Sequence, residues 1–311
     1  MTQLHFFKSP KVWLYALWKF SRPHTIVGTS LSVWGLFAIA WATVPALDLP
    51  SLWPVPVWAW LACLGGNVYI VGLNQLEDVA IDRINKPHLP LASGEFSRRQ
   101  AVGIIAFCST LAIAIALSQG PFLLATVGTS LLIGTAYSLP PIRLKRFPFW
   151  ASFCILSVRG AIVNLGLYLH YSDRFGLQLA VPARVWALTL FVLIFSFAIA
   201  IFKDIPDIEG DRRYSITTFT VQLGQKTVFD LARWVLTLCY GGLIVTGPFL
   251  ADVNGWFLSL THLAAIALFW WLSFRVVWQN RTSGISYSAF YQFIWKLFFI
   301  EYLLFPLACW L

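Results

Sequence analysis

Nine long apolar segments run through this chain, and little sequence lies between them. They fall near residues 26–44, 55–81, 100–117, 121–138, 148–170, 184–203, 228–250, 255–274 and 288–310. A helix needs roughly 17–25 mostly apolar residues to cross a bilayer, so each segment can span one. The predicted fold class is therefore an all-α, polytopic membrane protein with nine transmembrane helices. We expect a single domain over residues 1–311, in which residues 1–25 form an N-terminal arm on the inner side.

The composition agrees with a membrane protein and argues against several other classes. Only 11% of the 311 residues are charged, whereas a soluble domain carries about 25%. The formal net charge is +9, but the basic residues are spread over short connectors, so no nucleic-acid partner is expected. The 5 cysteines and 5 histidines are scattered singly, which argues against a disulfide framework and against a zinc or haem site.

Cations are distributed unevenly among the connectors between the spans. Those after the second, fourth, sixth and eighth spans carry several lysines or arginines, whereas the others carry almost none except Arg174 and Arg184. The positive-inside rule then puts the N-terminus and the basic connectors on the cytoplasmic side and the C-terminus outside. The N-terminal arm lacks the Arg- and Ser-rich character of a transit peptide, which favours a bacterial membrane over a plastid one.

Three oxygen-bearing side chains follow at four-residue intervals where the second span ends. They are Asn74, Asp78 and Asp82, which share one face of a helix. Such oxygens suit a hard cation such as Mg²⁺, which also takes water and substrate phosphates as ligands. A solvated helix end is the alternative, but aspartate is a poor helix former and Glu77 falls off the stripe. We therefore expect Mg²⁺ on Asp78 and Asp82, with Asn74 as a neutral ligand.

A second acidic run ends the sixth span and falls on the same predicted side of the membrane. Asp207 and Asp211 stand four residues apart, and Asp204 precedes them. We expect Pro206 to bend or end the helix and Gly210 to allow a ligand to approach closely. A polar loop would also produce such a run, and spacing alone does not decide which acids touch the metal. The favoured ligands are Asp207 and Asp211, and two such clusters followed by cations indicate diphosphate chemistry.

A diphosphate needs cations beside the carboxylates to balance its charge. The candidates that follow the two motifs, or lie in the connector after the fourth span, are Arg83, Lys86, Arg143, Lys145 and Lys203. Each could instead be only a topology determinant, but a preceding Pro-Pro pair favours Arg143 and Lys145. Further candidate contacts to substrate are Asp204, Tyr137, Arg22 and His24.

Three ionisable residues lie inside predicted spans, where a charge is costly and marks a function or a partner. Arg159 is near the middle of the fifth span, and Lys296 and Glu301 lie in the ninth. Arg159, together with Asn164, could reach an anionic acceptor from within the bundle. Lys296 and Glu301 could instead satisfy each other or nearby polar groups.

The two acidic motifs within nine spans resemble the UbiA-type family of intramembrane aromatic prenyltransferases. The family signature, N-x-x-x-D-x-x-x-D followed by D-x-x-x-D, is matched by Asn74, Asp78, Asp82, Asp207 and Asp211. Residues 18–25, 85–94, 202–207 and 291–296 are similar to the homogentisate prenyltransferase branch, in particular the phytyltransferases of cyanobacteria and plants. The resemblance implies a nine-helix bundle around a central cavity that inner-side loops cap. It also implies Mg²⁺ as cofactor.

The reaction that the resemblance implies is transfer of a prenyl group from a prenyl diphosphate, with phytyl diphosphate favoured, to homogentisate. Loss of the carboxyl group would leave a precursor of tocopherol or another prenylquinone. A related alternative is another acceptor, such as 4-hydroxybenzoate or a chlorophyllide. A membrane transporter is a further alternative, but its ionisable residues would lie near the bilayer midplane, whereas these acids gather at span ends.

Overall fold

The described part of the chain is built from helices joined by turns and loops. The computed structural model describes residues 9–44, 52–214, 216–279 and 287–311, so residues 1–8 of the predicted arm lie outside it. Within these ranges, nine helices are long and apolar enough to cross a membrane. They are α2 (Pro23–Trp41), α4 (Pro54–Glu77), α7 (Arg98–Gln119), α8 (Pro121–Ser138), the continuous α9 (Pro148–Leu156), η2 (Ser157–Ile162) and α10 (Val163–Arg174), α11 (Ala183–Phe202), α14 (Gln225–Thr246), α15 (Gly255–Gln279) and α16 (Tyr287–Trp310). The predicted all-α fold is confirmed.

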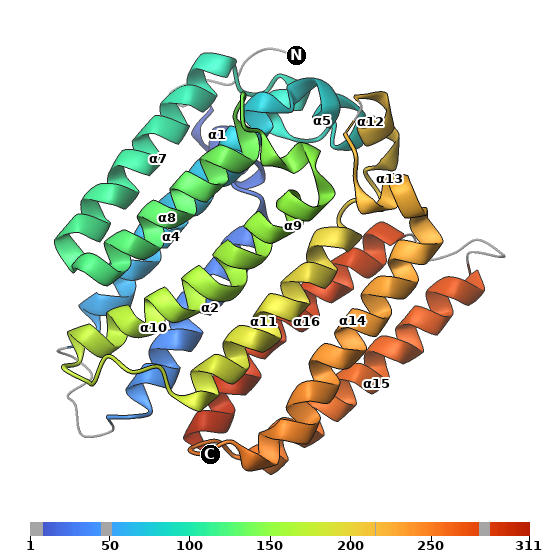
Figure 1. Cartoon of the computed structure of the whole chain (residues 1–311). Coiled ribbons are helices and arrows are strands. Elements are labelled where there is room, and N and C mark those ends of the chain that lie inside the picture. The colour runs from blue at the N-terminus through green and yellow to red at the C-terminus, as the bar shows by residue number, and fades with distance from the viewer. Residues whose placement is uncertain (1–8, 45–51, 215, 280–286) are drawn as a thin grey trace.

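The spans lie side by side (Figure 1), but they do not contribute equally to the central cavity. Its described lining residues come from the spans α2, α4, α8, α9–α10, α11 and α16, together with Tyr15 and Lys19 of the N-terminal arm and the connectors at one end. None of the described lining residues belongs to α7, α14 or α15. These three helices pack outside the ring, α7 against α4 and α8, α14 against α11, and α15 against α14 and α16. The expected cavity is present, and six of the nine spans surround it rather than all nine.

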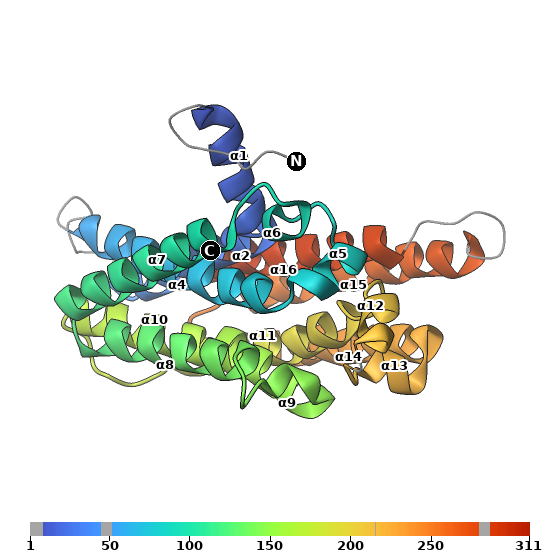
Figure 2. The same ribbon diagram turned by 90° about the horizontal axis from the view of Figure 1, so that it is seen from above.

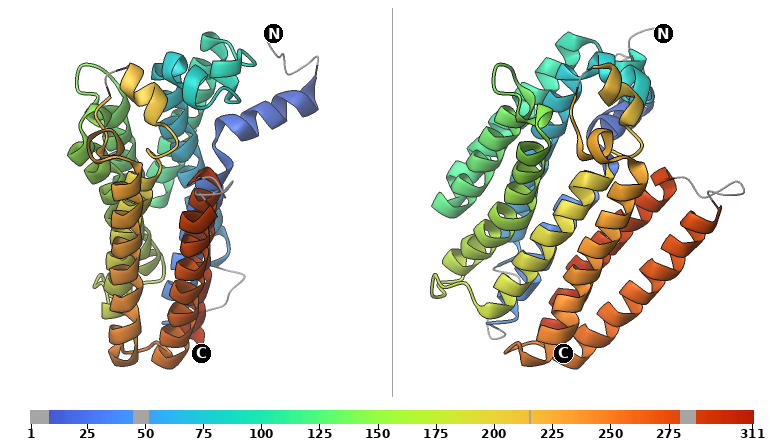
Figure 3. Two further views of the ribbon diagram at one scale, coloured as in Figure 1. Left: turned by 90° about the vertical axis from the view of Figure 1, so that its right-hand side faces the viewer. Right: turned by 45° about the vertical axis from the view of Figure 1, so that its right-hand side comes forward.

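Short helices close one end of the bundle. They are α5 (Val79–Asn85), α6 (Pro90–Ser93), η1 (Leu144–Arg146), α12 (Ile208–Arg213) and α13 (Phe219–Leu223). Figures 1 and 3 show α5, α12 and α13 at the end opposite the C-terminus. Because α5 carries the end of the first acidic motif and α12 the end of the second, both motifs lie at one end. The prediction that both acidic motifs lie on the same side of the membrane is therefore confirmed.

The described N-terminal arm is itself a helix, α1 (Pro10–Phe20), which projects away from the bundle (Figures 2 and 3). Its last turn is fixed to the connector after α6. The Phe20 ring contacts the Phe96 ring at 5.8 Å between centroids, and Lys19 Nζ lies 2.5 Å from Glu95 Oε1. The first span begins at Pro23, slightly earlier than predicted, so the arm ends at Arg22.

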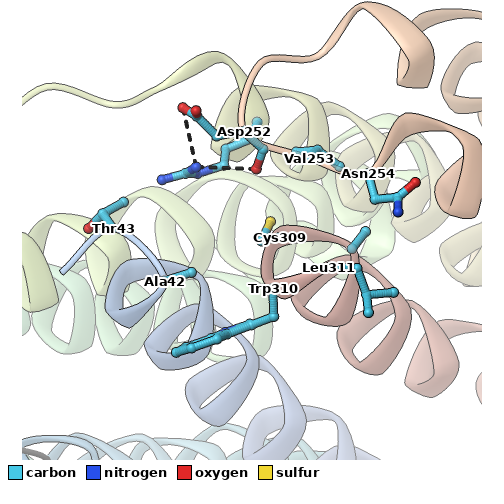
Figure 4. Close-up of a pocket in the computed structure, with 10 residues that line it drawn as sticks. Ala42, Thr43, Asp252, Val253, Asn254, Cys309, Trp310 and Leu311 are labelled. Carbon is cyan, nitrogen blue, oxygen red and sulfur yellow. Dashed lines mark hydrogen bonds and ion pairs between the residues drawn. The ribbon is translucent and has the colours of Figure 1, made fainter. Parts of the chain in front are cut away.

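A pocket of about 620 Å³ opens at the other end of the bundle (Figure 4). It is formed where residues 252–254, which follow η3 (Gly247–Phe249), meet the C-terminal ends of α2 and α16. The Asn254 main-chain N–H donates to Ala308 at 2.7 Å, and buried Arg184 lies 3.5 Å from Asp252 Oδ2. Arg184, one of the two exceptions to the loop-charge pattern, is thus paired locally with an acid and lies far from both acidic motifs.

Small residues let α4 and α7 pack closely. A Cβ atom added to Gly65 of α4 would lie 2.8 Å from the Cys108 carbonyl oxygen and 3.1 Å from the Ala112 Cβ, both on α7. Close approach at small residues is a general way in which membrane helices gain packing contacts. On α7, exposed Gly103 has no atom within 4 Å of such a Cβ. The two glycines therefore differ sharply in what surrounds them.

We expect Gly65→Ala to destabilise the protein and Gly103→Ala not to do so. The added methyl group at position 65 must push α7 away, and overpacking of this kind costs about 1–3 kcal/mol. At position 103 the methyl group meets open space, and alanine favours a helix over glycine by about 1 kcal/mol. Thermal unfolding of the two variants in the same detergent measures the difference. Equal midpoints would contradict the close packing of α4 on α7.

Candidate active site

The first acidic motif sits where a transmembrane helix breaks. The second span was predicted to run to residue 81, but α4 ends at Glu77, and Asp78 leaves the helical conformation with φ −109° and ψ 16°. The four-residue register survives, because the Asp82 N–H donates to the Asp78 carbonyl at 2.8 Å. Asn74 Nδ2 donates to Asp78 Oδ2 at 3.0 Å. Asn74, Asp78 and Asp82 therefore still face the same cavity, although on two helices rather than one.

Two cations from the connector after α8 hold the Asp78 carboxylate. Arg143 Nη2 lies 3.0 Å from Oδ1, and Lys145 Nζ lies 2.5 Å from Oδ2. Arg143 adopts a left-handed backbone with φ 40°, and Lys145, two residues later, lines the cavity. Burial lowers the pKa of the Lys145 ammonium, and the neighbouring Asp78 opposes this change. The break between α4 and α5 therefore falls at the residue whose carboxylate is held by both cations.

The second acidic motif lies in the turn after α11 and in α12. Lys203 Nζ pairs with Asp204 Oδ1 at 2.8 Å, and the Asp211 N–H donates to the Asp207 carbonyl at 3.2 Å. Burial lowers the pKa of the Lys203 ammonium, but Asp204 and Tyr137 outweigh this and raise it well above the ordinary value. α11 already ends at Phe202, so the helix stops before Pro206.

Two adjacent residues of the first half join the two motifs. The Lys86 ammonium pairs with the Asp207 carboxylate. Asn85 Nδ2 donates to the Asp207 carbonyl at 3.0 Å, and its Oδ1 accepts from the Gly210 N–H at 3.0 Å. Asn85 was not predicted as a site residue, because its only signal in the sequence was its place beside Lys86. Gly210 was predicted to allow a ligand to approach closely, but in the structure the Asn85 side chain occupies that space.

One cavity of about 790 Å³ collects most of the predicted site residues. Its lining includes Arg22, His24, Asn74, Asp78, Asp82, Lys86, Tyr137, Lys145, Arg159, Lys203, Asp204, Asp207 and Asp211. We call the end with the two acidic motifs the mouth. Arg83 is exposed and is not among the described lining residues, because it points away from the stripe of Asp78 and Asp82. Arg143 is also not among the described lining residues, and it contacts the cavity only through its ion pair with Asp78.

The deeper wall of the cavity is aromatic. The His24 ring lies 4.8 Å from the Trp295 ring, and the Arg159 guanidinium lies 4.7 Å from Trp295 and 5.5 Å from Phe298. Tyr291 also lines this wall. Sequence alone could not separate these aromatic residues from lipid-facing ones. The cavity thus joins a charged mouth to an apolar, aromatic depth.

The other two intramembrane charges lie outside the cavity. Glu301 Oε2 is 2.9 Å from His262 Nε2, and both side chains are buried between α15 and α16. Lys296 is exposed on the bundle surface. The Glu301 carboxyl group is therefore hydrogen-bonded to His262, and Lys296 is not its partner.

The acids at the mouth carry the features of a cation site without a complete set of protein ligands. Burial raises the pKa of the Asp82 carboxyl to about 6. Burial, together with Asp204 and Asp207, raises that of Asp211 to about 7. Asp82 Oδ2 is buried without a hydrogen-bond partner in the described structure. No group of three or more His, Cys, Asp or Glu is arranged to hold a metal within the described ranges. The oxygen donors fit Mg²⁺, which is commonly held by one or two carboxylates plus substrate phosphates.

Comparison with known proteins places this architecture. The sequence profile of the UbiA prenyltransferase family matches residues 30–297. The chain belongs to the UbiA prenyltransferase family. It is 51% identical over 300 residues to the homogentisate phytyltransferase of Synechocystis sp., covering 96% of each chain. It is 40% identical to the chloroplastic homogentisate phytyltransferase 1 of Arabidopsis thaliana, covering 94% of this chain and 75% of that one.

Solved structures of the family share the fold. The structure of a UbiA homolog from Archaeoglobus fulgidus bound to GPP and Mg²⁺ superposes with a TM-score of 0.68 at 17% identity, covering 94% of this chain and 98% of that one. The UbiA-type fold predicted from the motifs is therefore confirmed. Membership of an integral, multi-pass family of prenyltransferases also excludes the transporter alternative.

We expect Asp82→Asn to stabilise the metal-free protein more at about pH 8 than at about pH 5. The raised pKa means that the folded state binds the Asp82 proton more tightly than the unfolded state does. The resulting stabilisation is present below the unfolded value of 3.8 and is lost as the pH rises through about 6. Asparagine is neutral throughout, so the advantage of the variant should grow across this window.

Thermal unfolding in detergent with a chelator measures this difference in the parent, in Asp82→Asn and in Glu209→Gln. Glu209 is an exposed carboxylate beside the second motif and serves as the matched control. The control should show little change in its difference from the parent between the two pH values. An Asp82→Asn difference that is equally independent of pH would contradict the buried, proton-holding carboxyl.

Proposed function

We propose that this enzyme transfers a prenyl group, phytyl in particular, from its diphosphate to homogentisate, with loss of CO₂, to form a prenylquinol precursor of tocopherol. The observation that carries the proposal is the meeting of both acidic motifs with lysines at the mouth of one aromatic cavity. The acceptor follows from relatives named homogentisate phytyltransferases at 51% and 40% identity. In this reaction the diphosphate lies at the mouth and the prenyl chain lies among the helices.

The residues at the mouth fit a Mg²⁺-dependent reaction. Asp78, Asp82, Asp207 and Asp211 would hold the ion, with Asn74 as a neutral oxygen ligand. Mg²⁺ bound there would neutralise the charge that develops on the departing diphosphate. The unpartnered Asp82 Oδ2 supports this assignment, because a buried carboxylate oxygen without a donor needs a cation.

The side chains of the protein do the remaining work at the two ends of the cavity. Lys86, Lys145 and Lys203 line the mouth and can exchange their aspartate partners for phosphate oxygens. The aromatic wall of Trp295 and Phe298 excludes water from the allylic carbon and presents ring faces that stabilise positive charge. A ring carbon of the acceptor then forms a bond to the allylic carbon as the C–O bond breaks. The ring loses a proton, the carboxymethyl group loses CO₂, and a proton on its carbon completes the methyl group.

The same proposal includes the cellular setting. We infer a cyanobacterial membrane, with the mouth and the N-terminus on the cytoplasmic side. Support comes from the cyanobacterial relative at 51% identity and from the cations that gather in the connectors at the mouth end.

Purified protein should convert homogentisate and phytyl diphosphate to the decarboxylated prenylquinol, detected by its mass, and a chelator should abolish turnover until Mg²⁺ is restored. Asp78→Asn and Asp207→Asn should each lower turnover by about 100-fold or more, the scale of losing an electrostatic contact to a developing charge. Glu209→Gln, which removes an exposed carboxylate, is the matched control and should retain parental turnover.

Parallel incubations with geranylgeranyl diphosphate and with 4-hydroxybenzoate compare donors and acceptors. Exclusive prenylation of 4-hydroxybenzoate would refute homogentisate as the acceptor. Near-parental turnover in Asp78→Asn or Asp207→Asn would remove that residue from the metal site.

A further inference from the structure

Arg159 is a cation inside the membrane cavity that has no carboxylate partner among the described residues. It lies in the π-helical turn η2 of the fifth span and lines the cavity. Its guanidinium stacks on Trp295 and Phe298, and its Nη1 is buried without a hydrogen-bond partner among the described residues. The ionisable groups near it include the phenols of Tyr291 and Tyr302 and the imidazole of His24, none of which is an acid that would be negatively charged at neutral pH. Ring faces only partly offset the cost of an isolated charge in a low-dielectric site.

The lysines at the mouth differ from Arg159 in this respect. Lys86 pairs with Asp207, Lys145 with Asp78, and Lys203 with Asp204. No described carboxylate forms an ion pair with Arg159. The protein therefore supplies carboxylate partners to the three lysines at the mouth and none to Arg159, among the described residues. Arg22 also lines the cavity without an ion pair, but its guanidinium donates to Asn74 Oδ1 at 3.2 Å. An anionic ligand is the remaining source of a counterion.

The position of Arg159 suits the acceptor rather than the diphosphate. Arg159 belongs to the aromatic wall, whereas the acidic motifs and their lysines form the mouth. His24 lines the same cavity, and its ring lies 4.8 Å from the ring of Trp295. A small aromatic molecule in this layer would have its ring beside the allylic carbon and a substituent directed at Arg159. A chain of methylene groups, the rest of the donor, offers no group for this cation.

We propose that Arg159 binds the carboxylate of the aromatic acceptor and thereby selects an acceptor that carries a carboxylate over a neutral quinol. The inference rests on the proposed function, because it assigns the place of the acceptor in that reaction. A carboxylate binds in the plane of a guanidinium, often through two parallel hydrogen bonds. Binding at the edge leaves the face of the guanidinium on Trp295, so the stacking persists. A neutral quinol would leave the cation without a counterion and would bind more weakly.

Steady-state kinetics of Arg159→Met with homogentisate, with 2-methylhydroquinone and with the prenyl diphosphate test this assignment. 2-Methylhydroquinone has the same ring without the carboxylate. The KM for homogentisate should rise by about 10- to 100-fold, the range expected for loss of a hydrogen bond to a charged group. The KM values for 2-methylhydroquinone and for the donor should stay at the parental level. The preference for homogentisate should fall by the same factor, and Arg159→Lys should restore part of it by keeping the charge without the planar fork.

Arg184→Met is the matched control, because it removes a buried arginine at the opposite end of the bundle. It should leave all three KM values unchanged. An equal loss for both acceptors in Arg159→Met, or a raised KM for the donor, would overturn the proposal, because Arg159 would then serve the fold or the diphosphate. If that variant turns over neither acceptor, calorimetry decides. Retained donor binding with lost homogentisate binding supports the proposal, and any other pattern contradicts it.

The experiment also separates this inference from the proposed function. A parent enzyme that prenylates homogentisate, with an unchanged homogentisate KM in Arg159→Met, contradicts only the role of Arg159. A parent enzyme that prenylates 2-methylhydroquinone but never homogentisate refutes the proposed acceptor and, with it, this inference.

Discussion

Mutual repulsion among the aspartates at the mouth of the cavity is the constraint on which the arrangement of the helices depends. The described lining residues include Asp78, Asp82, Asp204, Asp207 and Asp211. Like charges in a partly buried site repel far more strongly than they would in water, so cations must be brought close to them. These cations come from the connectors after α4, α8 and α11, which are distant in sequence. Packing the spans so that these connectors meet at one end is what assembles the site.

The cavity is also divided by polarity, with a charged mouth and an apolar depth. The mouth is a network of acids and lysines, in which Asp78, Asp204 and Asp207 are paired with lysines. The depth is apolar and aromatic, with Arg159 as its one cation among the described lining residues of that wall. Under the proposed function, this division places the leaving group in the polar region and the reactive carbon in the dry one. A small acceptor is then held between them.

Sequence predicted the elements better than their contacts. The nine spans follow from the length of the apolar runs, because a bilayer imposes that length locally. The end of α4 at Glu77 was missed, because it coincides with contacts that Arg143 and Lys145 make to Asp78 from another connector. The bridge from Asn85 to α12 was missed for the same reason. Spacing identified the acids, but only the fold shows that Arg83 points away and that Arg159 lacks a carboxylate partner among the described residues.

The most direct test of the shared site is a double-mutant cycle on binding rather than on turnover. Calorimetry in the presence of Mg²⁺ would measure the Kd of a non-hydrolysable prenyl diphosphate analogue for the parent, Asp78→Asn, Asp207→Asn and the double variant. If both motifs grip one diphosphate, the losses are not additive, and the coupling energy should exceed about 1 kcal/mol. Losses that add to within about 0.5 kcal/mol would show two independent sites and contradict the account.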